Sequence, residues 1–149
     1  FSLRPNQLFA LSLHRPLVTG SRAAKALEAV EDKLLTPYGL RSLDPSHPDY
    51  RGRYEGGPAE RDAAYHQGTV WPWLLGPFVD AHLAVRGNNP ESRRVASAWL
   101  APLVEHLFGT GLGQLPEVFD GDPPHRPGGC VAQAWTVGEM LRAVLKTGA

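Results

Sequence analysis

The sequence predicts an all-α fold of about five helices joined by two long irregular connections. Apolar residues recur at helical spacing through most of the chain, and no segment shows the alternating pattern of a convincing strand. The 14 prolines and 16 glycines gather between the helical segments, where they favour ordered loops. With 149 residues the chain is long enough for one domain with a sizeable core. We therefore expect a single unit over residues 1–149.

The charge balance argues against nucleic acid or a membrane as a partner. The formal charge is +0 at pH 7 and the pI is near 7.2, so the chain has no basic footprint. No apolar run is long enough to span a bilayer. The one cysteine, Cys130, permits no internal disulfide, which is compatible with a reducing compartment, and we predict a cytoplasmic location. Because the chain begins at Phe1 and not at Met, we expect it to be a piece of a longer chain.

Capping signals and apolar spacing define the first two helices. Pro5 disfavours helix before it, Asn6 can cap the segment after it, and a short apolar helix is predicted over residues 8–13. Ser21 is the predicted N-cap of the second helix, which ends before Thr36. The residues of this helix expected to face inward are Ala23, Leu27, Val30 and Leu34.

Two longer helices are predicted in the middle of the chain. The first has Thr69 as its N-cap and Pro72 in its tolerant first turn, and it ends at Gly87. The second has Asn89 as its N-cap and ends at Gly109. The inward residues expected are Trp71, Leu74, Leu75, Phe78, His82 and Val85 in the first helix, and Val95, Trp99, Leu103 and Leu107 in the second.

The remaining elements are two long connections and a last helix. The first connection covers residues 36–65, and its tyrosines and arginines favour a functional loop over a disordered one. The second surrounds Glu117, where three prolines and a glycine prevent a regular helix. The last helix is predicted from about Cys130 to Lys146. Its inward residues are expected to be Ala134, Val137, Leu141 and Val144 or Leu145.

The order of the elements predicts that the two long connections meet. If the helices alternate up and down, the connections after the second and fourth helices lie at the same end of the stack. Tyr54, Tyr65 and His66 then lie close to Glu117 at one mouth. A carboxylate on a rigid loop backed by helices suits acid/base chemistry on a polar substrate. We therefore regard Glu117 as the candidate chemical centre.

Five separated motifs together resemble the C-terminal glucosidase domain of glycogen debranching enzymes, the amylo-α-1,6-glucosidase. They run in order over nearly the whole chain, and five motifs are far more specific than any one alone. The motifs are Arg4-Pro5-Asn6-Gln7, Leu35–Arg41, Tyr65–Trp73, Pro116–Asp122 and Gly129–Trp135.

The resemblance implies a fold, a reaction and a partner. The family fold is an (α/α)6 toroid, of which this chain would be the C-terminal portion. The family removes single α-1,6-linked glucose stubs from glycogen-type glucans with inversion, a reaction that needs one carboxylic acid and one carboxylate. By position Glu117 matches the catalytic base, and the general acid, an Asp, would lie upstream of Phe1. The resemblance therefore implies that the upstream half of the same domain is a required partner and that the isolated fragment is inactive.

The candidate sugar-binding residues lie around the aromatic motif. His66 and Gln67 are polar groups beside aromatic rings, the combination by which proteins hold sugars. Tyr65 and Trp71 share this motif, although core packing explains Trp71 equally well. Tyr54 either lines the mouth or pins its own loop, and the N-terminal pair either caps a helix or reaches the pocket. The complete set of substrate-binding candidates is His66, Gln67, Trp71, Tyr65, Tyr54, Asn6 and Gln7.

Two other classes of site and one other function were weighed. Asp120 and Asp122 offer too few oxygen ligands for a cation loop, and adding His125 and Cys130 gives no common zinc spacing. We therefore predict no metal, and glycoside hydrolysis by two carboxyl groups needs no cofactor. Without the resemblance, Glu117 would be read as an ordinary loop carboxylate. The alternative function is a non-catalytic helical module that binds carbohydrate or another protein.

Overall fold

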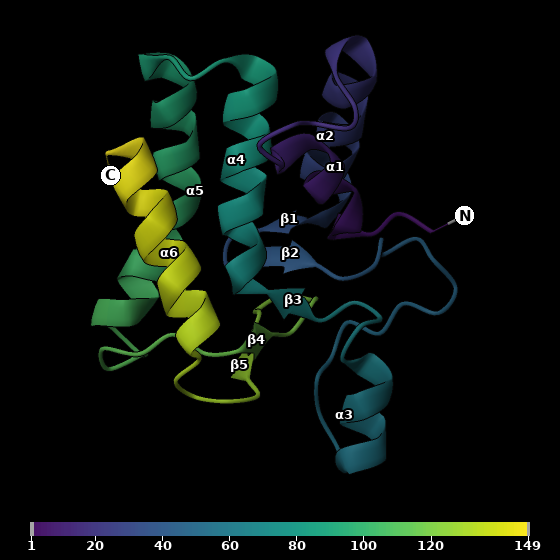
Figure 1. Ribbon diagram of the computed structural model, residues 1–149. Coiled ribbons are helices and arrows are strands. Elements are labelled where there is room, and N and C mark those ends of the chain that lie inside the picture. The colour runs from purple at the N-terminus through teal and green to yellow at the C-terminus, as the bar shows by residue number, and fades with distance from the viewer. Residues whose placement is uncertain (1, 149) are drawn as a thin grey trace.

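The computed structural model describes residues 2–148, in which six α-helices and two 3-10 helices (η1 and η2) accompany a five-stranded antiparallel sheet (Figure 1). The helices are η1 Pro5–Leu8, α1 Phe9–Ser12, α2 Gly20–Leu34, α3 Pro58–Ala64, η2 Pro72–Leu74, α4 Leu75–Arg86, α5 Pro90–Phe108 and α6 Ala134–Thr147. The strands are β1 Leu35–Thr36, β2 Gly39–Arg41, β3 Val70–Trp71, β4 Val118–Phe119 and β5 Pro127–Gly128. No helix within residues 2–148 has the length and apolar character needed to cross a membrane.

Helix α4 is the centre of the molecule. It contacts α1, α2, α5 and α6, and residues on all of its sides are buried. A helix that is apolar all round is stable only when neighbours surround it. Burial of the predicted inward residues Leu75, Phe78 and His82 is confirmed, and Gly87 ends the helix as predicted. The predicted cap is wrong: the Thr69 hydroxyl donates to the Ala64 carbonyl at 2.8 Å, and the helical segment begins at η2.

The prediction for α2 is confirmed in its buried face. Its four predicted inward residues are at most 2% exposed, namely Ala23, Leu27, Val30 and Leu34. The helix begins at Gly20, after Thr19, and not after Ser21 as predicted. The N-cap of α5 is confirmed, since the Asn89 side chain accepts the backbone N–H of Ser92 at 3.0 Å. Of the four residues predicted to face inward from α5, Leu103 is buried and the other three are half-buried.

The sheet corrects the prediction that the chain has no convincing strand. It is ordered β1-β2-β3-β4-β5, with Leu40 opposite Trp71 and Val70 opposite Phe119. Each strand has only two or three residues, which is too short for period-two alternation to be detected. β1 and β2 form a local hairpin, whereas β2, β3 and β4 come from segments distant in the sequence that pair across the end of the helices. The fold is therefore mostly helical with a small sheet.

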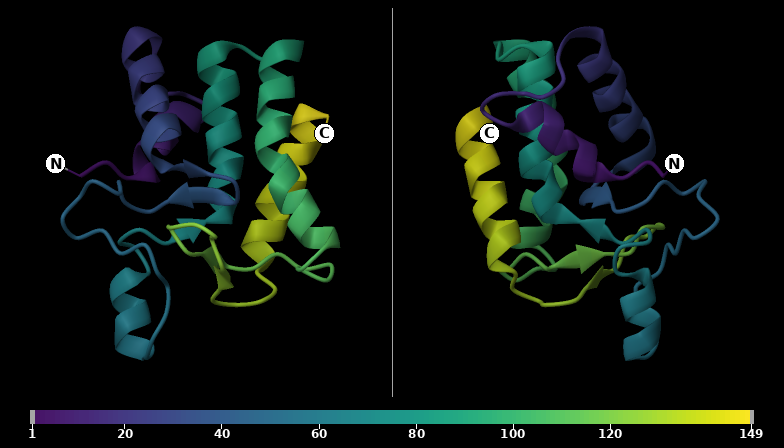
Figure 2. Two further views of the ribbon diagram at one scale, coloured as in Figure 1. Left: turned by 180° about the vertical axis from the view of Figure 1, so that it is seen from behind. Right: turned by 45° about the vertical axis from the view of Figure 1, so that its right-hand side comes forward.

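The first long connection is more ordered than predicted. It contributes β1, β2 and the seven-residue helix α3, whose start is marked by Pro58 at its first turn. The Glu60 side chain accepts the backbone N–H of Gly57, so a capping interaction closes the helix start. Figures 1 and 2 show α3 on the far side of the sheet from the five other α-helices. The ends of the two long connections do lie together at this end, as the alternation of helices predicts.

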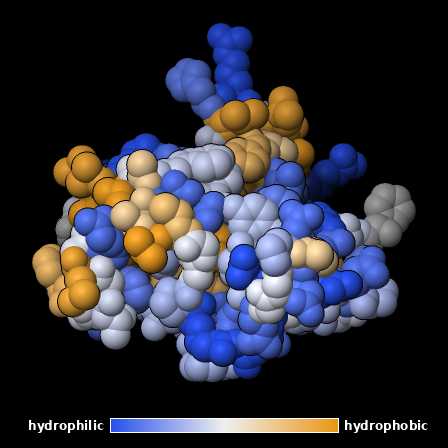
Figure 3. Space-filling view, turned by 90° about the horizontal axis from the view of Figure 1, so that it is seen from below, coloured by the Kyte–Doolittle hydropathy of each residue, from blue (hydrophilic) through white to orange (hydrophobic). Residues whose placement is uncertain are grey.

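Helix α6 faces the other way from the prediction. Its buried residues are Thr136, Met140, Ala143 and Thr147. Of the residues expected to face inward, Ala134 is exposed and Val137 and Leu141 are 41% and 58% exposed. Of the two alternatives at the end of the helix, Val144 is half-buried against the core and Leu145 is 75% exposed. Apolar spacing identified the apolar stripe of α6 but not the side of the helix that faces inward. The opposite side, which carries smaller residues, packs against α4 and α5. Apolar side chains lie on the side of the molecule formed by α5 and α6 in Figure 3.

This exposed stripe predicts self-association of the isolated 149-residue chain. Sedimentation at several concentrations should show reversible oligomers, because contiguous apolar surface seeks a partner. The double substitution Leu141→Lys and Leu145→Lys should give a monomer with little loss of stability, since both positions are exposed.

Glu105→Lys is the matched control, because it changes the net charge by the same amount at an exposed site on α5. It should leave the association intact. A wild-type chain that remains monomeric at all concentrations would contradict the prediction.

Candidate active site

Glu117 lies immediately before β4, where the antiparallel pairing with β5 continues by one residue. Its backbone N–H donates to the Cys130 carbonyl at 2.8 Å. Gly129, opposite it, has a φ of +68°, and a Cβ there would collide with Glu117 Oε2. A side chain at position 129 would therefore be strained and would also displace the carboxylate. The sheet edge and this glycine together place the Glu117 side chain.

Three donors hold the Glu117 carboxylate. Oε1 accepts the Tyr65 hydroxyl at 2.5 Å and the Gln133 side-chain amide at 3.3 Å. Oε2 accepts the backbone N–H of Cys130 at 2.9 Å. Because three donors meet its two oxygens, the carboxylate is held in one orientation.

The Tyr65 hydroxyl is a donor that keeps its proton. Burial raises the pKa of Tyr65 above its ordinary value, and the hydrogen bond to Glu117 and its negative charge raise the pKa further. The ring is packed as well: Tyr54 lies 5.7 Å away and Trp71 lies 4.6 Å away, centroid to centroid. The predicted proximity of Tyr54, Tyr65 and Glu117 is therefore present in the structure.

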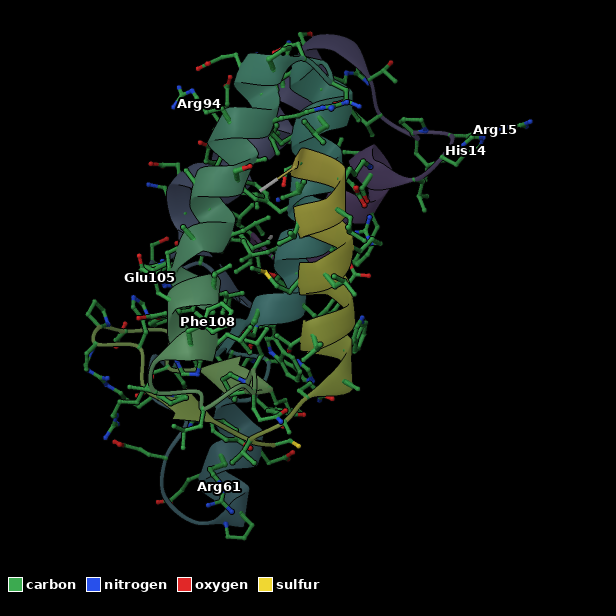
Figure 4. The ribbon with its side chains drawn as sticks, turned by 90° about the vertical axis from the view of Figure 1, so that its left-hand side faces the viewer. His14, Arg15, Arg61, Arg94, Glu105 and Phe108 are labelled. Carbon is green, nitrogen blue, oxygen red and sulfur yellow. The ribbon has the colours of Figure 1, made fainter. Side chains whose placement is uncertain are left out.

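Glu117 opens onto a cavity of about 510 Å³ between the sheet edge and α3. One side of the cavity is formed by Gly128 of β5 and by Gly129, which follows it, and another side includes Arg61 of α3. Figure 4 shows Arg61 at the far end of the molecule from Arg94. The lining residues are Tyr54, Glu55, Arg61, Glu117, Gly128 and Gly129. A carboxylate beside an open cavity of this size can reach a polar substrate.

A second cavity, of about 420 Å³, is lined by aromatic rings. His66 stacks on Trp71 with 5.4 Å between ring centroids, and Trp73 stacks on Trp135 at 3.9 Å. Trp71 is only 9% exposed, whereas Trp135 of α6 is 53% exposed. Exposed stacked rings offer flat apolar faces of the kind that sugar rings pack against. Tyr65 lies between the two cavities, since it contacts both Trp71 and Glu117.

The polar candidate residues differ in which of their hydrogen-bonding groups are available to a sugar. Asn6 and His66 line the aromatic cavity and are exposed. The Gln67 side-chain oxygen already accepts Arg4 at 2.6 Å, which leaves its amide N–H groups. Gln7 does not line either cavity, and its Nε2 is buried without a hydrogen-bond partner among the described residues.

Asp120 joins the two long connections. Its carboxylate accepts the backbone N–H of Tyr54 at 2.8 Å, Arg126 Nε at 2.9 Å and Arg53 Nη1 at 3.2 Å. Burial alone would raise the pKa of Asp120, but the Tyr54 N–H and the two guanidinium groups outweigh it, so the pKa is lowered. Asp120 is thus an ionised structural anchor beside the candidate site.

Several site residues were not identified from the sequence. Gln133 and Gly129 lie in a motif that resembles the family, yet their roles depend on contacts with Glu117 across more than ten residues. Tyr50 donates to Asp122 at 2.9 Å, and burial followed by that contact raises the pKa of Tyr50 to about 12. Among residues 2–148, no three His, Cys, Asp or Glu side chains gather as metal ligands would.

Replacing Asp120 by Asn should lower the free energy of unfolding by about 2 kcal/mol at neutral pH, because hydrogen bonds to a charged group are lost. The wild-type contribution should be present above the ordinary pKa of 3.8 and lost as the pH falls through the lowered native pKa. Urea unfolding at neutral and acidic pH measures both effects.

Asp122→Asn is the control, since one tyrosine hydroxyl holds that half-buried carboxylate. It should cost less. Equal losses from the two variants would show that Asp120 is not the anchor.

Comparisons with known proteins identify the family of this chain. Residues 1–142 match the amylo-alpha-1,6-glucosidase family. The glycogen debranching enzyme of Saccharomyces cerevisiae is 38% identical over 87 residues, which is 54% of this chain and 6% of that enzyme. Because the family match covers nearly all of its residues, the chain belongs to the amylo-alpha-1,6-glucosidase family.

Proposed function

We propose that this chain carries the catalytic base and part of the sugar pocket of an inverting α-1,6-glucosidase that acts on glycogen-type glucans. The observation that carries the proposal is the Glu117 carboxylate, held by three donors at the edge of an open cavity beside an aromatic one. The yeast relative is a glycogen debranching enzyme, which supports a glucan substrate.

The proposed chemistry needs two carboxyl groups on opposite faces of the bond. In inversion, one group protonates the glycosidic oxygen while the other takes a proton from the attacking water. Glu117 serves as the base. Glu55 lines the same cavity, but its carboxylate is engaged by Arg126 at 2.5 Å, so we assign it no acid role. The acid is supplied by another part of the toroid to which this chain belongs.

The aromatic cavity is the proposed site for sugar rings. Trp73 and Trp135 provide a stacked apolar face, and His66 and Asn6 provide hydrogen-bonding groups at its rim. Rings pack on the apolar side of a pyranose, while imidazole and amide groups bond its hydroxyls. Since Tyr65 touches both cavities, a glucan that fills the aromatic cavity can place its terminal linkage at Glu117.

Glu117→Gln in the full-length protein should lower kcat by about 10²–10⁴-fold, the usual contribution of general base catalysis. Gln keeps the shape of Glu but removes the basic oxygen, so KM should change little. Azide needs no base and should partly restore turnover with a β-linked product. Kinetics on a single branched oligosaccharide measure all three.

Asp122→Asn again serves as the comparison and should have a smaller effect on kcat. Near-normal turnover in the Glu117 variant, with collapse in an Asp120 or Asp122 variant, would move the base elsewhere. Glucan binding by a wild-type protein that never releases glucose would instead favour the non-catalytic binding module.

His66→Ala should raise KM about fivefold to tenfold and leave kcat nearly unchanged, because one hydrogen bond to the sugar is lost. The matched control is His14→Ala. His14 is also exposed, and Figure 4 shows it far from Arg61 and α3. Equal KM values for the two variants would remove His66 from the binding site.

A further inference from the structure

The two oxygens of the Glu117 carboxylate accept different numbers of hydrogen bonds. Each carboxylate oxygen offers about two lone-pair positions for hydrogen bonds. Oε1 uses both, for the Tyr65 hydroxyl and the Gln133 amide. Oε2 uses one, for the backbone N–H of Cys130 at 2.9 Å. One position, on Oε2, therefore remains for a water molecule.

The donors to Oε1 are themselves fixed. The Trp71 indole N–H donates to the Tyr65 carbonyl at 3.0 Å, and its ring packs edge-on against the Tyr65 ring. Gln133 is the N-cap of α6, and its backbone N–H donates to the Leu115 carbonyl at 2.9 Å. The backbone of each donor residue is therefore anchored, which fixes the direction from which its side chain approaches Glu117.

The other ionisable groups around the carboxylate have partners of their own. Glu55 pairs with Arg126, and the Arg61 guanidinium donates to the Gly56 carbonyl at 3.1 Å. The Cys130 thiol donates to the Ala132 carbonyl at 3.4 Å. Tyr54 packs against the Tyr65 ring, and the Tyr65 hydroxyl donates to Glu117. Tyr65 is thus the titratable group in direct contact with the carboxylate, and burial and the Glu117 charge keep it protonated by raising its pKa.

We propose that Tyr65 and Gln133 are positioning residues that occupy Oε1, so that Oε2 is the oxygen that takes the proton from the attacking water. This inference rests on the proposed function of Glu117. It changes the role of Tyr65 from a sugar contact to a partner of the base. Loss of the Tyr65 hydroxyl frees a position on Oε1 and lets the carboxylate rotate out of its orientation toward the attacking water.

The test is Tyr65→Phe in the full-length protein. It should lower kcat about tenfold, as expected for a hydrogen bond to a charged group, with KM nearly unchanged. Gln133→Leu should lower kcat by less, since its contact is longer at 3.3 Å, and it provides the test if the tyrosine variant does not fold.

Tyr38→Phe is the matched control. Tyr38 stacks on Phe119 at 4.5 Å, and its substitution removes a hydroxyl from the same sheet region without touching Glu117. Its kcat and KM should match the wild type. A purely structural role for Tyr65 would lower the yield of folded protein and leave kcat per folded molecule unchanged.

A double-mutant cycle separates this inference from the proposed function. Once Glu117 is Gln, adding Tyr65→Phe should have little further effect on azide-rescued turnover, because the two residues act as one unit. An equal loss in both backgrounds, or an unchanged kcat in both Tyr65→Phe and Gln133→Leu, would overturn the positioning role. Near-normal turnover of Glu117→Gln would instead overturn the assignment of the base.

Discussion

The buried carboxylate of Asp120 holds the two long connections together, and the rest of the site depends on this contact. Its side chain is 3% exposed and is met by two arginines and by the backbone N–H of Tyr54. A charge buried to this degree is tolerated only when donors surround it. The first long connection must therefore stay against the segment that carries Glu117. Tyr54 is positioned by this contact and then packs against Tyr65.

The core supplies the rigid support behind this junction. Helix α4 is surrounded by α1, α2, α5 and α6, and the short sheet closes the end of this group of helices. Phe119 of β4 is 1% exposed, so Glu117, two residues earlier, starts from an immobile strand. Thr136 of α6 donates to the Pro116 carbonyl at 3.1 Å on the other side of Glu117. The candidate base is thus fixed from the sheet and from a helix start, as a site with defined geometry requires.

The exposed apolar stripe on α6 concerns the packing of the helices and not the candidate site. Three residues one helical turn apart carry it, and the opposite face of α6 is already used by α4 and α5. The yeast relative is much longer than the matched segment, which is 6% of its length. A helix with one face packed inside and an apolar face uncovered is in keeping with the proposed toroid, in which each helix has neighbours on both sides.

Apart from α3, the sequence by itself determined the described α-helices. It also determined the buried face of α2, the caps at Asn89 and Gly87, and the meeting of Tyr65 with Glu117. These follow from local spacing, capping chemistry and the alternation of helix directions, which neighbouring residues encode. Tertiary structure alone decided the five short strands, the inward face of α6, and the donors that hold the two carboxylates. Those features depend on pairs such as Gln133 with Glu117 and Arg126 with Asp120, in which each residue acts through a particular approach of two loops. The periodicity of residue types along the chain does not predict such contacts, because their energy arises only when folding brings the two loops together.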